Sequence, residues 1–110
     1  RAGGDVEEVS EGEIRKDPFL LNTRNRTLEK NGQRIKLTQV EYTIMKMFME
    51  NPEKALSREE ILDMVWGHDY FGEVKIVDVN IRRLRLKIED NPQNPTYITT
   101  VWGYGYKWGF

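Results

Sequence analysis

Hydrophobic and polar residues alternate in short runs at the start of this chain and then recur at helical spacing. Between residues 14 and 37 the apolar runs are brief and are separated by turn residues, which is typical of antiparallel strands. One turn contains Asn31-Gly32, two residues that tolerate the positive φ of a tight hairpin. We therefore predict a small antiparallel sheet, with strands near residues 19–21, 27–29 and 34–37.

Two capping boxes mark the start of two helices. Thr38 and Ser57 can each cap a helix, and a glutamate three residues later, Glu41 or Glu60, can bond back to the cap amide. Apolar residues at helical spacing follow both boxes, and Asn51-Pro52 is expected to end the first helix. These residues are Val40, Ile44, Met47 and Phe48 in the first helix and Ile61, Leu62 and Val65 in the second.

A third helix is predicted over residues 74–89. Four apolar residues fall on one stripe and are expected to face the core: Val77, Ile81, Leu84 and Ile88. The opposite side carries Ile76, Val79, Arg83 and Leu86, with Asn80, Arg82 and Lys87 on its flanks. Residues 97–101 and 106–108 are expected strands joined by a glycine-containing turn. The order of sheet, three helices and hairpin predicts an α+β fold.

Composition narrows the class of protein. A chain of 110 residues holds one domain. It has no cysteine, which excludes disulfides and thiolate metal sites and favours a cytoplasmic location. Its single histidine excludes a multi-histidine metal centre, so we expect no metal or other cofactor. Because the sequence has no run of 18 apolar residues and no visible export signal, we expect no membrane partner.

Charge is unevenly distributed, although the net charge is only −1. Residues 1–13 carry five acids against Arg1 and lack periodicity, so we interpret them as an acidic linker or tail before a single domain over residues 14–110. Residues 75–87 carry five basic groups against Asp78 alone. A small basic field on a nearly neutral domain indicates that one face contacts a polyanion.

The basic side of the third helix fits the major groove of DNA. Arginine can bond guanine there, Val79 and Ile76 suit thymine methyl groups, and Asn80 suits an adenine edge or a phosphate. The flanking cations Lys75, Arg82, Arg85 and Lys87 can reach phosphates. The helix alone leaves a second interpretation open, in which the arginines only cover the core of a solvated amphipathic helix. The two preceding helices and the hairpin favour DNA binding, because together they form a helix-turn-helix with a wing.

Four sequence motifs occur in order along the chain: LTQVEY at residues 37–42, SREEILDMVWG at residues 57–67, VDVNIRRLRLKI at residues 77–88 and ITTVWGYGY at residues 98–106. They resemble, in the same order, the two helix openings, the recognition-helix signature and the closing hairpin of the OmpR/PhoB family of response-regulator effector domains. The resemblance covers residues from about 18 to 109.

The resemblance implies a winged helix-turn-helix with an N-terminal four-stranded antiparallel sheet, three helices and a C-terminal β-hairpin wing. It implies sequence-specific binding of promoter double-stranded DNA and transcription regulation, as the effector domain of a two-component response regulator. The partners it implies are a second copy on direct-repeat half-sites, RNA polymerase, and a receiver domain upstream in the parent chain, which a sensor histidine kinase phosphorylates.

The resemblance also implies roles for single residues. Helix 74–89 would enter the major groove through Val79, Asn80 and Arg83, with Arg82 and Arg85 on phosphates or bases. The wing, residues 97–108, would lie beside the adjacent minor groove, with Thr100 and Tyr106 near phosphates. Many relatives have an arginine where this chain has Trp102. The indole would stack on sugars, pack beneath the wing or contact a partner.

The loop at residues 66–73 matches the family segment that touches RNA polymerase. It consists of Trp66, Gly67, His68, Asp69, Tyr70, Phe71, Gly72 and Glu73. We expect Trp66 to pack over the core, whereas Tyr70 and Phe71 either pack or form a protein-contact patch. One imidazole beside Asp69 is not a catalytic site, and we expect no enzyme activity. The alternative function is a winged-helix protein–protein interaction module, which the apolar Ile76, Val79, Leu86 and Trp102 would serve.

Overall fold

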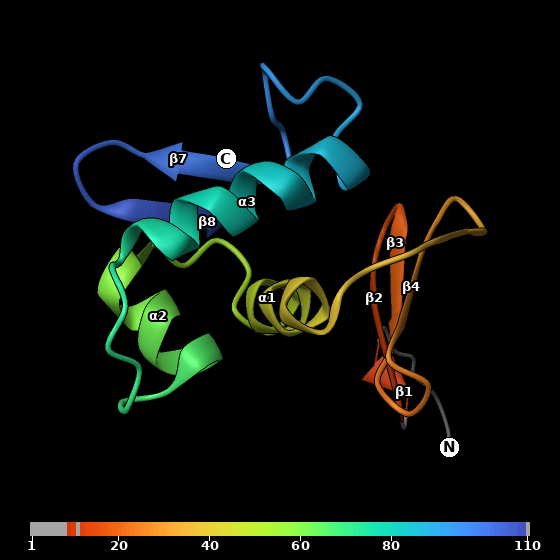
Figure 1. Ribbon diagram of the computed structural model, residues 1–110. Coiled ribbons are helices and arrows are strands. Elements are labelled where there is room, and N and C mark those ends of the chain that lie inside the picture. Colours follow the sequence, from red (N-terminus) through yellow and green to blue (C-terminus); the bar gives the residue numbers. More distant parts are fainter. Residues whose placement is uncertain (1–8, 11, 110) are drawn as a thin grey trace.

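The computed structural model describes residues 9–10 and 12–109, and in them a central helix separates two antiparallel sheets (Figure 1). The central helix is α1 (Gln39–Glu50). The N-terminal sheet has the strand order β1-β2-β3-β4-β5. Its strands are β1 (Val9–Ser10), β2 (Glu13–Lys16), β3 (Phe19–Asn22), β4 (Thr27–Lys30) and β5 (Gln33–Ile35).

The register of the N-terminal sheet explains which residues reach the core. One row across β2–β5 consists of Ile14, Leu21, Leu28 and Ile35, all of which are buried in the core or packed against it. The turn between β4 and β5 uses positive φ at Asn31 (53°) and Gly32 (82°), as the sequence predicted. The expected four-stranded sheet is confirmed as β2–β5.

The two-residue strand β1 adds a fifth strand that the sequence did not predict. It pairs with β2, so the sheet begins at Val9, within the segment that we interpreted as an acidic tail ending at residue 13. Glu13 is itself the first residue of β2. Residues 1–8 and 11 of that expected tail lie outside the described residues.

Both capping boxes form, and they set where α1 and α2 (Arg58–Trp66) begin. The amide of Glu41 donates to Thr38 Oγ1 at 3.1 Å, and the amide of Thr38 donates to Glu41 Oε1 at 2.9 Å. Ser57 and Glu60 repeat this arrangement at 3.0 and 2.8 Å. The third helix, α3 (Lys75–Ile88), has no side-chain cap.

The second sheet contains a strand that the sequence did not predict. Its order is β6 (Leu56–Ser57), β8 (Gly105–Trp108) and β7 (Ile98–Val101). The expected C-terminal hairpin is therefore confirmed, but β6 also attaches it to the start of α2. This close approach requires Gly105, since a Cβ there would lie 2.0 Å from the carbonyl oxygen of Leu56.

One core joins all of these elements. Its largest fully buried side chains include Phe19 and Leu21 from the first sheet, Phe48 from α1 and Ile81 from α3. The ring of Phe19 meets that of Tyr97 edge-on at 4.8 Å between centroids, which ties the first sheet to the start of β7. No helix among the described residues is long and apolar enough to cross a membrane.

Candidate nucleic-acid interface

The helix α3 presents one side to the core and the opposite side to solvent, as predicted. Its inward stripe, Val77, Ile81, Leu84 and Ile88, is fully buried. On the outward side Val79 is 40% exposed and Leu86 is 67% exposed, between the exposed cations Lys75, Arg82 and Arg83. These residues and Asp78 line a shallow apolar groove along the helix. Ile76 differs from the prediction, because it is half-buried and packs against the core.

Three cations of this helix keep their charge available to a ligand. The side chains of Lys75, Arg82 and Arg83 form no ion pair with another described residue, and all three are exposed. The outward face therefore combines unpaired positive charge with exposed aliphatic surface. That combination suits phosphates together with the methyl-bearing edges of bases.

Arg85 does not belong to this set, although we expected it on the flank within reach of phosphates. Its Nε donates to the carbonyl oxygen of Ile98 at 3.0 Å, and its Nη2 donates to that oxygen at 2.8 Å and to Thr100 Oγ1 at 2.9 Å. The guanidinium also lies 5.3 Å from the ring centroid of Tyr106. Burial lowers the pKa of Arg85. Arg85 and Thr100 therefore join α3 to the wing.

Lys87 is also held by the protein rather than free for phosphate. Its Nζ lies 2.5 Å from Glu41 Oε1, and the Glu41 side chain is only 3% exposed. Burial acts to raise the pKa of Glu41, but hydrogen bonds from Lys87 and Thr38 outweigh it and hold that pKa below its ordinary value. The ion pair connects the C-terminal half of α3 to the start of α1.

The structure also contradicts the predicted position of Asn80 on an exposed flank. Asn80 is 8% exposed, and its Nδ2 donates to the carbonyl oxygen of Ile76 at 2.9 Å. The helical spacing placed Asn80 near the boundary between the two faces. The short amide side chain turned back to its own helix, which removes it from the outward surface.

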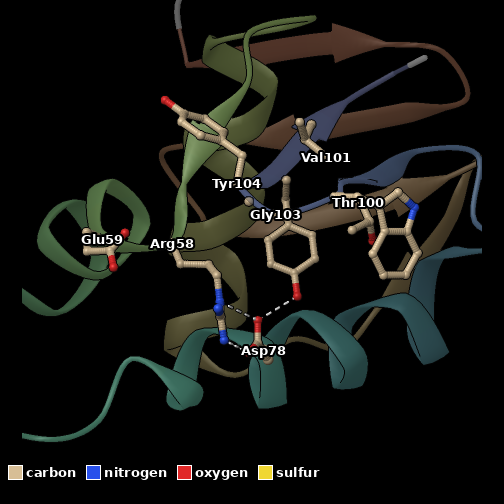
Figure 2. A pocket seen from close by; sticks show the side chains of 10 residues that line it. Arg58, Glu59, Asp78, Thr100, Val101, Gly103 and Tyr104 are labelled. Carbon is tan, nitrogen blue, oxygen red and sulfur yellow. Dashed lines mark hydrogen bonds and ion pairs between the residues drawn. The ribbon is translucent and has the colours of Figure 1, made fainter.

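Asp78, for which the sequence predicted no role, joins three elements. Arg58, the first residue of α2, donates to both of its carboxylate oxygens, with Nε 3.2 Å from Oδ1 (Figure 2). The hydroxyl of Tyr106 on β8 donates to Oδ1 at 2.6 Å. Burial and this hydrogen bond raise the pKa of Tyr106 to about 12. The signal that could have found this network is that Asp78 is the one acid of α3.

A cavity of about 350 Å³ lies between this network and the turn of the wing. It is lined by Arg58, Glu59 and Asp78 and by residues 100–106 (Figure 2). Trp102 in that turn is 89% exposed, which excludes the option that it packs beneath the wing. Tyr104, in the same turn, is 48% exposed.

Residues 66–73, which were expected to form a loop, lie between α2 and α3, except that Trp66 is the last residue of α2. Trp66 is half-buried and packs against the core, as expected, and the Tyr70 ring lies 6.1 Å from its centroid. Phe71 is 97% exposed, so it is the aromatic residue that this loop offers to solvent. His68 is exposed, with Nδ1 3.4 Å from Asp63 Oδ2, and Gly67, Asp69, Gly72 and Glu73 complete the loop.

Comparison with known proteins identifies the family. Residues 32–108 match the family model described as transcriptional regulatory protein, C terminal. The structure of the response regulator DrrB of Thermotoga maritima, an OmpR/PhoB homolog, superposes with a TM-score of 0.82 at 32% identity, over 90% of this chain and 45% of that chain. The chain belongs to the OmpR/PhoB family of transcriptional regulators.

Two curated relatives extend the comparison. The sensory transduction protein RegX3 of Mycobacterium leprae is 38% identical over 97% of this chain and 54% of its own length. AfsQ1 of Streptomyces coelicolor, a transcriptional regulatory protein, is 44% identical over 81% of this chain and 40% of its own length. The chain thus spans about half the length of the curated relatives that it matches.

A further structural neighbour is a DNA-binding domain that was solved in a complex. The DNA-binding domain of Klebsiella pneumoniae RstA, in complex with the RstA box, superposes with a TM-score of 0.80 at 27% identity. The match covers 88% of this chain and 96% of that domain. The winged-helix fold expected from the sequence is therefore confirmed.

Proposed function

We propose that this chain binds double-stranded DNA sequence-specifically and regulates transcription, as the effector domain of a two-component response regulator. Helix α3 is the recognition helix in the major groove, and the β7–β8 wing lies beside the adjacent minor groove. The observation that carries this proposal is the outward face of α3, where Lys75, Arg82 and Arg83 are exposed and unpaired around Val79 and Leu86. The structure of the RstA domain with its DNA box adds support from a homologous domain.

The outward residues divide into two kinds of contact. Arg83 reads a base edge, and Val79 supplies an apolar contact for a thymine methyl group. Lys75 and Arg82 position the domain on phosphates, which supplies affinity without sequence information. Trp102 replaces a charged wing contact with an aromatic one, which stacks on sugars of the minor-groove edge.

The remaining partners belong to the parent regulator. We propose a phosphorylated receiver domain upstream, controlled by a sensor histidine kinase, and a second copy of the chain on direct-repeat half-sites. The chain acts in the cytoplasm, where the exposed Phe71 in loop 66–73 offers RNA polymerase an apolar contact. About half the length of the matched relatives lies outside the match, which is consistent with such a parent chain.

A specific observation also favours the alternative function of a protein-interaction module. Trp102 and Leu86 are large apolar side chains with 89% and 67% exposure, and such surface is typical of protein contacts. The two functions differ in their response to salt. DNA binding releases counterions and weakens steeply as salt rises, whereas an apolar protein contact does not.

Selection of duplexes from a random pool tests the proposed function. We expect the chain to enrich one motif, in tandem copies. Its affinity should fall steeply between 50 and 200 mM salt, since a protein with ~6–10 phosphate contacts loses three or more orders of magnitude in affinity over that range. Failure to enrich any duplex at low salt would contradict the proposal. A single enriched motif without a repeat would contradict only the paired arrangement.

Arg83→Ala tests the base-reading role directly. Loss of a bidentate contact to a base should weaken binding to the selected duplex by ~1–3 kcal/mol and relax the preference at one base pair. Binding to a scrambled duplex should change much less. The measurement is fluorescence anisotropy with both duplexes at fixed salt. An equal loss on both duplexes would show that Arg83 contacts phosphate instead.

A further inference from the structure

Asp78 lies in the first turn of the proposed recognition helix, on a surface that is otherwise basic. An exposed carboxylate at this point is stabilised by the helix dipole but repels DNA phosphates. Asp78 is not a simple surface acid, however, because its side chain is only 33% exposed and accepts three hydrogen bonds. The charge of its carboxylate is therefore paired within the protein.

These partners come from the two elements that flank α3. Arg58 begins α2, and its guanidinium bonds both carboxylate oxygens as a fork. Tyr106 lies on β8 and donates to Oδ1 at 2.6 Å. Figure 1 shows that α2, the start of α3 and the turn of the wing meet at the same end of the molecule. One carboxylate therefore fixes the recognition helix to both α2 and the wing.

The same contact determines what Arg58 can bind. Its side chain is 41% exposed beside the wing cavity, so it would be within reach of a polyanion if it were released. While both carboxylate oxygens hold the guanidinium, its charge is paired and its Nε and Nη2 donors are occupied by Asp78. Asp78 thus keeps one cation out of the unpaired set that Lys75, Arg82 and Arg83 form.

We propose that Asp78 is a specificity-determining positioning residue, which orients α3 against α2 and the wing and withholds Arg58 from non-specific contact with phosphates. The inference rests on the proposed function, because it concerns how the chain distinguishes one duplex from another. Specific binding needs α3 in one orientation, whereas binding to random DNA needs only accessible positive charge. The two roles of Asp78 therefore act in opposite directions on the two classes of duplex.

Asp78→Asn separates these effects. Affinity for the duplex selected by the wild-type chain should fall ~10-fold, the size of one good polar contact, because α3 loses its fixed orientation. Affinity for a scrambled duplex of the same composition should rise, and its salt slope should steepen by ~0.9, because the freed Arg58 reaches one more phosphate. Fluorescence anisotropy over a salt series measures both, and circular dichroism confirms that the variant is folded.

Two matched variants serve as controls. Arg58→Gln breaks the same ion pair without releasing a cation. It should weaken specific binding, and its affinity for the scrambled duplex should be no higher than that of the wild type. Tyr106→Phe removes only the third hydrogen bond and should lower specific binding with no change in salt slope. If Asp78→Asn does not fold, these two variants still decide the matter, since unchanged specific binding in both would overturn the inference.

The outcomes also separate this inference from the proposed function. An equal loss on both duplexes in Asp78→Asn would mean that Asp78 is merely structural and would overturn the inference. No change on either duplex would overturn it as well. In both cases the wild-type chain still binds DNA and the proposed function stands. A wild-type chain that binds no duplex would overturn both.

Discussion

At the scale of single residues, the phenol of Tyr106 is the group whose ionisation the fold opposes most clearly. Tyr106 is half-buried and its hydroxyl donates to Asp78 Oδ1, so loss of the proton would place a negative oxygen against a carboxylate. Burial and this hydrogen bond raise its pKa from an ordinary value of 10.0 to about 12. The folded state therefore favours the neutral phenol.

The direction of this shift predicts how stability depends on pH. A group whose pKa is raised by folding contributes its full stabilisation below the unfolded pKa and loses it as pH rises through the folded pKa. The wild-type chain should therefore lose stability relative to Tyr106→Phe between pH 10 and 12, a window set by the two pKa values of Tyr106. Urea midpoints of both proteins across this range measure the difference. A constant difference from pH 9 to 12 would contradict the raised pKa.

At the scale of elements, the wing depends on the contact between β6 and β8. A Cβ on Gly105 would lie 2.0 Å from the Leu56 carbonyl oxygen and 2.9 Å from Ser57 Cα, both of which are backbone atoms. Backbone atoms cannot rotate away as the end of a side chain can. Any side chain at residue 105 must therefore push β8 away from β6 and from the start of α2.

Gly105→Ala should for this reason cost more than ~3 kcal/mol of unfolding free energy, at the upper end of the range for overpacking. The matched control is Gly103→Ala in the turn just before β8, where φ is 76° but no atom lies within 4 Å of the added Cβ. That substitution should cost only the ~1–2 kcal/mol of a left-handed residue. Urea unfolding compares the two variants. If both variants lose the same unfolding free energy, the β6–β8 contact is not the reason that residue 105 must be glycine.

The same elements show what the sequence could predict. The capping boxes of Thr38 and Ser57 and the apolar stripe of α3 are local signals, and all of them were predicted. Strand β6 has two residues and exists only because β8 passes beside it, so its own sequence carries no strand pattern. The fold was therefore predictable where an element is determined by its own residues.

For the candidate site, prediction from the sequence is limited by long side chains, which can reach partners on distant elements. Helical spacing correctly placed Arg82 and Arg83 outward, because that depends on α3 alone. It could not place Arg85 or Lys87, whose partners lie 13 residues away on β7 and 46 residues away on α1. The spacing predicts the direction in which each side chain points from the helix axis. The distant partners determine the position of the charged group at its end.

At the scale of the whole molecule, the basic charges of α3 divide into an external and an internal set. Lys75, Arg82 and Arg83 are unpaired among the described residues, whereas Arg85 and Lys87 join α3 to β7 and α1. A formal charge count gives both sets equal weight in DNA binding. We therefore expect the first set to release counterions on DNA binding and the second set to contribute to stability, because a cation that bonds the protein releases no counterion on binding.

Arg82→Gln and Lys87→Gln test this division, since each removes one positive charge from the same helix. Arg82→Gln should reduce the salt slope of DNA binding by ~0.9 and change stability by less than ~0.5 kcal/mol. Lys87→Gln should leave the slope unchanged and cost ~1–3 kcal/mol of stability, because Glu41 would remain charged and buried without its ion-pair partner. Anisotropy over a salt series and urea unfolding measure the two quantities. Equal loss of slope in both variants would mean that Lys87 leaves Glu41 for a phosphate when the chain binds DNA.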